Sequence, residues 1–240
     1  MPASKATTIV LLIVTSVFFV FYGFAVGENG RHSSSDTRKA GHNSQEAARV
    51  RITKIENRIA QQQKDVQGLF EVTSSLDLPD LDVEDNIYDP PTLRSAIQNA
   101  NFSAQASLIV FGAGVETIQL TSALPNLITP MQIDGTGSGT SPVVLDGSLI
   151  TPDFTAQYGL FVTTGGHSIK NLEIRNFPDG GIVFSATSSF SEVKGCRIHH
   201  NGGPGINVNG TVGILIGGSL PEERNYQWKQ AYQNRKFAPV

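Results

Sequence analysis

A near-repeat in the last third of the chain constrains the fold more than any other feature. The segments IKNLEIRNFPDGGIVF (residues 169–184) and VKGCRIHHNGGPGINV (residues 193–208) align without gaps at an offset of 24 residues. Apolar residues match apolar residues in this alignment: Ile169 with Val193, Leu172 with Cys196, Ile174 with Ile198, and Ile182 with Ile206. Short alternating apolar runs at a fixed period indicate a solenoid of stacked β-strands.

From residue 108 onward, short apolar runs alternate with turns rich in Gly, Asp, Asn, Ser and Pro. The runs cover residues 108–111, 117–120, 131–133, 143–145, 160–162, 171–174, 182–184, 192–198, 206–208 and 214–216. Strands this short, without helical patterns between them, exclude an ordinary βαβ fold. A sandwich or barrel stays open, but neither needs the constant period. We expect two interior columns, Leu160 with Ile182 and Ile206, and Leu172 with Cys196, the only cysteine.

Residues 8–27 (TIVLLIVTSVFFVFYGFAVG) form an uncharged, mostly apolar stretch that is long enough to cross a bilayer as a helix. Residues 1–27 are therefore a transmembrane anchor or a cleaved signal peptide, since Ala25, Val26 and Gly27 form a small-x-small site. The apolar core of a secretory signal usually runs about 7–15 residues, which favours the anchor. Both interpretations place the body of the protein outside the cytosol, either membrane-anchored or secreted.

Residues 28–45 are polar and predict a flexible spacer. Residues 46–72 carry apolar side chains at heptad a and d positions and predict a short coiled-coil stalk. These positions are Ile52, Ile55, Ile59, Val66 and Leu69. A stalk would form a homo-oligomer through residues 50–70, whereas a single amphipathic helix lying on the domain would not, and the pattern leaves both open.

Residues 73–90 are acidic, and we expect a solvated linker because the spacing lacks the DxDxDG pattern of a calcium loop. Ca²⁺ is thus a possible cofactor without a supporting motif. Residues 91–101 predict a short helix with Pro91 in its first turn. Its apolar face would cover the first open edge of the solenoid. That face comprises Leu93, Ala96, Ile97 and Ala100.

Three segments resemble the right-handed parallel β-helix family of pectate-lyase-like proteins. TLRSAIQNAN (residues 92–101) is similar to the capping helix of secreted members, and LIVFGAGVETIQLTSALPNLITPMQIDG (108–135) to their first coil. ILIGGSLPEERN (214–225) is similar to a turn found in repeat-rich members. The resemblance covers residues 91–225 and implies an all-β, right-handed parallel β-helix with an N-terminal capping helix. Residues 226–240 form an atypical tail, so the chain looks like a short or truncated member.

Candidate chemistry lies on the outward positions of two strands, where Glu173 and Arg175 stack over Arg197 and His199. The resemblance implies that lyases and uronate epimerases of this fold use a basic side chain to remove the sugar C5 proton, beside a cation or arginine that neutralises the carboxylate. Arg175, Arg197 and His199 are therefore the catalytic candidates. The alternative is a favourable cross-strand pair on a solvated surface.

His200 and Asn176 share one column, and we expect a polar ladder rather than a metal site, because neighbouring strand residues point to opposite faces. Asp134-Gly135 and Asp146-Gly147 predict turns rather than calcium ligands. Asn101 and Asn209 lie in glycosylation sequons.

Two functional classes remain open for the chain. One is a non-catalytic surface module that binds glycans or proteins, and the other is a polysaccharide lyase or epimerase acting on acidic polysaccharide. The runs make about four coils, fewer than an extended sugar groove usually needs, which favours the module. The net charge of −3, without a basic patch, argues against nucleic acid as a partner.

Overall fold

Parallel β-strands dominate the computed structural model, which describes residues 46–57, 68–85, 87–137 and 141–228. Sheet A has the strand order β1 (Gly68–Val72), β2 (Ser107–Phe111), β4 (Met131–Asp134), β7 (Ser168–Lys170), β10 (Glu192–Lys194) and β13 (Leu215–Ile216). Sheet B has the order β14 (Tyr226–Trp228), β11 (Arg197–His199), β8 (Leu172–Arg175), β5 (Val143–Asp146) and β3 (Thr117–Gln119). Sheet C has the order β12 (Ile206–Val208), β9 (Ile182–Phe184) and β6 (Leu160–Val162).

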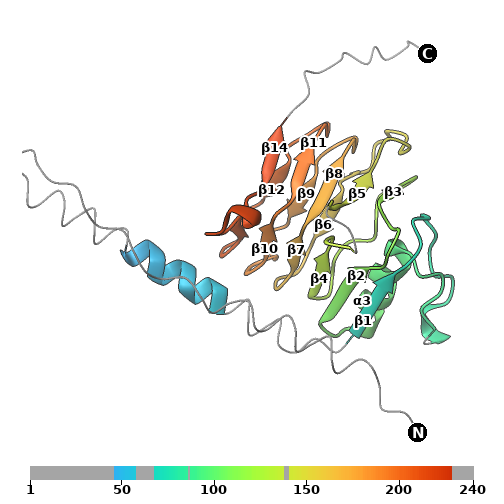
Figure 1. The fold of residues 1–240 in the computed structure, drawn as a ribbon, viewed down its shortest axis with the longest axis horizontal. Helices are drawn as coiled ribbons and strands as arrows, with labels where there is room; N and C mark the ends of the chain where they lie inside the picture. The colour runs from blue at the N-terminus through green and yellow to red at the C-terminus, as the bar shows by residue number, and fades with distance from the viewer. Residues whose placement is uncertain (1–45, 58–67, 86, 138–140, 229–240) are drawn as a thin grey trace, which may run out of the picture. The chain divides into compact units, whose positions relative to one another are not determined.

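The chain visits the three sheets in rotation, so that neighbouring strands of each sheet come from successive visits (Figure 1). Each strand pairs in parallel with its counterpart from the previous visit, an arrangement that fits a solenoid of stacked coils. The predicted offset of 24 residues is confirmed in all three sheets. The paired residues are Ile169 with Val193, Ile174 with Ile198, and Ile182 with Ile206.

Equivalent apolar residues of successive coils stack into columns that form the core. In sheet A, one column has no exposed surface at four successive positions: Ile109, Ile133, Ile169 and Val193. The predicted pairing of Leu160, Ile182 and Ile206 in sheet C is confirmed, as is the burial of Leu172 and Cys196. Burial of each large side chain stabilises the fold by roughly 1.5–3 kcal/mol.

The chain changes direction between the sheets at residues with left-handed backbone conformation. Asn171 (φ 55°) and Gly195 (φ 64°) occupy the turn between sheets A and B in successive coils. Asn176 (φ 61°) and His200 (φ 57°) follow the sheet B strands in the same way. Asn and Gly tolerate this conformation better than most residues. The repeat therefore preserves backbone geometry as well as the apolar columns.

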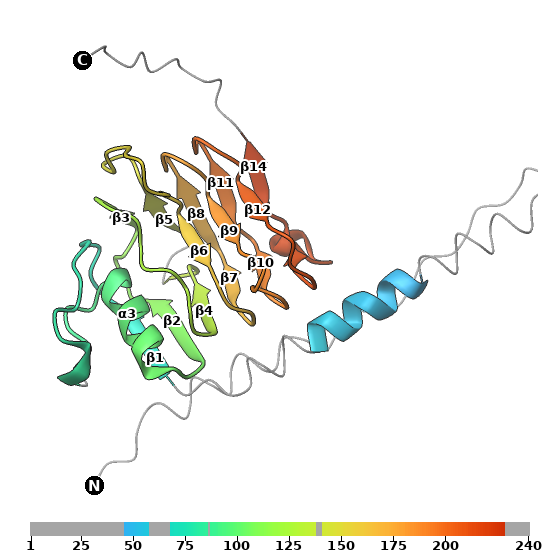
Figure 2. The ribbon, with the colours of Figure 1, turned by 180° about the vertical axis from the view of Figure 1, so that it is seen from behind.

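Helix α3 (Leu93–Ser103) covers the core at its N-terminal end, beside β1 and β2 (Figure 2). Its predicted apolar face is confirmed, since Leu93, Ala96, Ile97 and Ala100 are all fully buried. The helix begins later than predicted, because the Thr92 hydroxyl caps it by accepting a hydrogen bond from the Ser95 N–H at 3.2 Å. Pro91 thus precedes the cap instead of lying in the first turn.

The predicted stalk helix over residues 46–72 is wrong at its C-terminal end. The structure describes a helix at residues 46–57, but Gly68–Val72 forms strand β1 and pairs with β2. Phe70 and Val72 pack into the core while Leu69, counted as a heptad position, is 60% exposed. Alternating burial of this kind is the period of a strand rather than of a helix.

Residues 73–90 are predicted to be a solvated linker, but the structure shows that side chains of this segment form hydrogen bonds with the rest of the domain. The Asp77 carboxylate accepts hydrogen bonds from Arg94 Nε at 2.7 Å and from the Thr121 N–H at 2.9 Å. Asp80 accepts from Asn99 Nδ2 at 2.7 Å. These bonds fasten the segment to α3 and to the loop after β3, and they hold the pKa of both carboxyls below the usual range, against the burial that acts to raise them.

The predicted tail over residues 226–240 is also wrong at its start, because Tyr226–Trp228 forms β14 and adds a fifth strand to sheet B. The predicted anchor or signal peptide (1–27), the spacer (28–45) and the rest of the tail (229–240) lie outside the described residues. Within the described part of the chain, no helix reaches the length and apolarity needed to span a bilayer.

Candidate functional site

Five polar side chains from three neighbouring strands gather on the outer face of sheet B. We call them the charged strip: Asp146 of β5, Glu173 and Arg175 of β8, and Arg197 and His199 of β11. They lie together because alternate residues of a strand point away from the core and parallel pairing stacks them. The strand register sets Arg197 beside Glu173 and His199 beside Arg175, as the sequence predicts. The three catalytic candidates therefore share one surface.

Glu173 is the centre of the charged strip. Its Oε1 atom accepts a hydrogen bond from Arg175 Nη1 at 3.0 Å and lies 3.3 Å from His199 Nε2. Its Oε2 atom lies 4.0 Å from Arg197 Nη1. One carboxylate thus contacts all three candidate residues.

Asp146 holds Arg175 from the other side. Its Oδ2 atom accepts from Arg175 Nε at 3.1 Å, while Oδ1 accepts from the Ser148 N–H at 2.9 Å and closes the predicted Asp-Gly turn. Burial acts to raise the pKa of Asp146, but hydrogen bonds from Asn176, Ser148 and Arg175 outweigh it and lower the pKa. Sequence reasoning missed this partner because Asp146 and Arg175 are separated by more than one 24-residue period.

The two adjacent histidines contact one another, with ring centroids 4.6 Å apart and ring planes at 82°. The prediction that they point to opposite faces is wrong, because His200 has a φ of 57° and no longer follows strand alternation. Burial lowers the pKa of His199, and the neighbouring His200 and Arg175 act in the same direction against the opposing charge of Glu173. His199 is therefore neutral at pH 7.

In neutral His199, the Nε2 atom carries the proton, since the Glu173 carboxylate can only accept a hydrogen bond. The Nδ1 atom is then an acceptor, and it receives the hydrogen bond that His200 Nδ1 donates. Both ring nitrogens of His199 are thus engaged within the protein.

The strip is electrically balanced, with two carboxylates against two guanidinium groups. The side chains differ in access to solvent: 8% is exposed for Asp146 and His199, 14% for Glu173, 34% for Arg175 and 51% for Arg197. Only the Arg197 side chain is about half exposed, and its ion pair with Glu173 has the longest distance in the strip. Any ligand of the strip would meet this guanidinium first.

Tyr226 of β14 extends the strip by one strand and was missed, because the sequence interpretation placed it in a tail. It pairs in register with Arg197 and is 55% exposed. An aromatic residue two positions before the only tryptophan was the available signal, but no repeat motif marked it as part of a strand.

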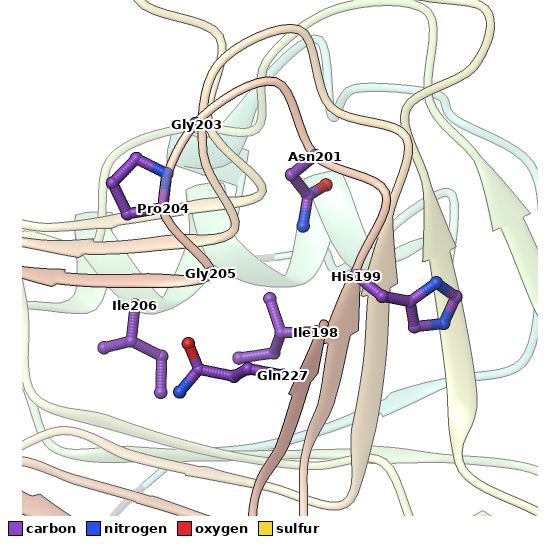
Figure 3. A pocket seen from close by; sticks show the side chains of 8 residues that line it. All are labelled: Ile198, His199, Asn201, Gly203, Pro204, Gly205, Ile206 and Gln227. Atoms are coloured by element: carbon purple, nitrogen blue, oxygen red, sulfur yellow. The ribbon is translucent and has the colours of Figure 1, made fainter. Parts of the chain in front are cut away.

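A cavity of about 270 Å³ lies at the last coil, lined by Ile198, His199, Asn201, Gly203, Pro204, Gly205, Ile206 and Gln227. Figure 3 shows the His199 ring pointing away from the other lining side chains. Ile198 packs into the core, and the ring of the next residue, His199, lies on the opposite face of β11. The cavity and the charged strip are therefore separate features.

The structure also shows the surroundings of the other residues considered in the sequence, the possible metal ligands and the two glycosylation sequons. Among the described residues, no cluster of three or more His, Cys, Asp or Glu side chains could hold a metal ion. Asp134 closes a turn by accepting from the Thr136 N–H at 3.0 Å. The Asn101 side chain donates to Asn126 O at 2.8 Å, whereas Asn209 lies exposed just after β12. Asn209 is thus the more accessible of the two sequons.

No family model matches the sequence, and neither the curated proteins nor the solved structures include a significant match.

Proposed function

We propose that this chain is a right-handed parallel β-helix of the pectate-lyase-like kind, held outside the cytosol by residues 8–27. The rotation of the chain through three parallel sheets supports the β-helix, and right-handed crossovers are the strong preference between parallel strands. The uncharged stretch at residues 8–27 supports the membrane anchor, with secretion as the alternative.

The function that the geometry supports best is non-catalytic binding of acidic polysaccharide on the outer face of sheet B. The observation that carries this proposal is the pair formed by Arg197 and Tyr226, which are register neighbours and are both about half exposed. A guanidinium group pairs well with a uronate carboxylate, and a tyrosine ring offers an apolar face to a pyranose ring. The pair thus supplies one contact of each kind that a charged sugar needs.

The internal bonds of the strip argue against catalysis as its main role. Arg175 lies between two carboxylates, and His199 uses both ring nitrogens within the protein. A general base must reach the proton that it abstracts, and an electrophilic arginine must reach the substrate carboxylate. Both groups would first have to give up their present partners.

Binding can be tested with immobilised pectate and alginate against neutral dextran. We expect the chain to bind the two uronans and to lose affinity as salt rises, since the main contact is ionic. Arg197→Ala and Tyr226→Ala should each weaken binding by roughly tenfold. Arg51→Ala is the matched control, because Arg51 is an exposed arginine on the helix of residues 46–57. Equal loss in Arg51→Ala, or equal binding to dextran, would refute a specific site.

A lyase or epimerase on the same face is the second candidate, favoured by a neutral His199 beside two arginines. His199 would take the C5 proton, and in a lyase the C4–O bond would then break to give an unsaturated uronate. Incubation with uronans, with and without calcium, tests this through ultraviolet absorbance of the product. A rise that His199→Ala and Arg175→Ala abolish would replace the binding proposal with the lyase. Epimerisation is followed by NMR of the treated polymer.

A further inference from the structure

The core columns become exposed at the last coil. In sheet A, the column that is fully buried from Ile109 to Val193 ends at Ile216, which is 47% exposed. In sheet C, Val162 and Phe184 have no exposed surface, but the next residue of that column, Val208, is 38% exposed. The cavity of about 270 Å³ opens beside Ile198 and Ile206 at the same place. Residues of the core columns are thus partly exposed to solvent at this end.

The two ends of the described solenoid differ. At the N-terminal end, α3 places a fully buried apolar face over the core. At the other end, β12, β13 and β14 are each the last strand of their sheet among the described residues. We call these three strands the terminal edge. The outer backbone groups and exposed apolar residues of such an edge form a surface that natural proteins cover or pair.

The residue spacing of the two preceding coils is not repeated in the sequence after β14. In two successive coils, sheet C begins nine residues after the matched position of sheet B, from Glu173 to Ile182 and from Arg197 to Ile206. Counting the same distance from Tyr226 gives Arg235, at a position that is isoleucine in both coils. A charged residue is a poor substitute in a buried apolar column. The isoleucine of these two coils is therefore not repeated at the matching position after Tyr226.

The terminal edge has properties that suit a second copy of itself. Two such edges related by a two-fold axis would meet with antiparallel strands, so each backbone donor finds an acceptor. Gln227 replaces the apolar residues of its column, Ile198 and Ile174, with an amide that both donates and accepts. Beside this edge, Glu222 and Arg224 carry opposite charges. Each feature complements its own copy.

We propose that the terminal edge is a homodimer interface, in which the last strands of two chains pair and close the open ends of both cores. This interface is independent of the predicted stalk over residues 50–70, and it does not depend on the proposed glycan binding. Its occupant is a second copy of this chain.

Thiol labelling of the full chain in detergent tests the proposal directly. The native Cys196 is buried and its pKa is raised to about 12, so an introduced cysteine is the only reactive thiol among the described residues. Ile216→Cys reports on the terminal edge, and Leu149→Cys, at a site 54% exposed, is the matched control. We expect labelling of Ile216→Cys to slow by about tenfold as protein concentration rises, while that of Leu149→Cys stays constant.

Two further variants distinguish the possible occupants. Adding Val208→Lys, on another strand of the edge, should restore fast labelling of Ile216→Cys, whereas adding Leu149→Lys should not. A chain that stops after residue 228 should keep the protection. If that shortened chain loses it, the chain's own residues 229–240 cover the edge and the proposal is overturned. Fast labelling at every concentration, or protection that concentration does not change, also overturns it.

Discussion

Protonation of one buried histidine is expected to make the fold acid-sensitive well above the pH at which carboxylates titrate. His167 follows sheet C, directly before β7, and has no exposed surface. Its Nδ1 atom lies 3.3 Å from the Met131 backbone nitrogen, and its Nε2 atom lies 2.9 Å from Thr164 Oγ1. Because a backbone N–H can only donate, Nδ1 is the acceptor, and the ring is the neutral Nε2–H tautomer.

The size of the effect follows from the two pKa values. Burial lowers the pKa of His167 from 6.5 to about 3 in the folded chain. The unfolded chain therefore binds a proton more readily, and stability falls as the pH drops below 6.5, until the folded pKa is reached. Between pH 7.5 and pH 5, this one group should lower the free energy of unfolding by about 2 kcal/mol. Buried carboxylates contribute little in this window; the pKa of Glu192, for example, is lowered to about 2.

Urea unfolding of the chain at the two pH values measures the effect, with His167→Gln as the comparison. The glutamine amide could accept from the Met131 N–H and donate to Thr164, but it cannot take up a proton. We expect the variant to lose most of the pH dependence that the wild-type chain shows. His199, whose pKa is also lowered, titrates in the same direction and is present in both proteins. Equal pH dependence in the two proteins would refute the role of His167.

Three other substitutions test the packing and the strip. Ile174→Ala should lower the free energy of unfolding by about 2–5 kcal/mol in urea titrations, because the side chain is fully buried in a core column. Gly181→Ala should cost about 1–3 kcal/mol in the same assay, since the new Cβ would lie 2.5 Å from the Gly205 carbonyl oxygen. Glu173→Gln should tighten uronan binding, because it removes the carboxylate that competes for Arg197; weaker binding would contradict the proposed contact.

The 24-residue repeat predicted those features of the structure that depend on strand register. A constant offset places Ile174 beside Ile198 and Glu173 beside Arg197, because parallel pairing needs only the register and the inward or outward direction. The core columns and four of the five members of the charged strip, all except Asp146, followed from that register. The apolar face of α3 was predicted from helical periodicity in the same way.

Features that do not follow the 24-residue period were not predicted from the sequence. Strand β1 has five residues, too few for its alternation to outweigh a heptad pattern that extends from the preceding helix. Asp146 and Arg175 pair across a coil that is longer than 24 residues, so the alignment does not bring them together. His200 contacts His199 because of a left-handed backbone conformation, which a histidine adopts less readily than Asn or Gly.

Strand β14 presents both proposed surfaces, and its alternation separates them. Tyr226 lies in register with the outward Arg197, whereas Gln227 continues the inward column of Ile198 towards the terminal edge. A single strand thus borders the glycan site with one residue and the dimer interface with the next. Tyr226→Ala should therefore reduce uronan binding and leave thiol protection at the edge intact, whereas Val208→Lys should abolish that protection and leave binding to a short oligomer intact. Two chains joined at this edge would also carry two sugar sites on one particle, so that loss of the dimer would weaken binding to a long polymer more than to a short oligomer.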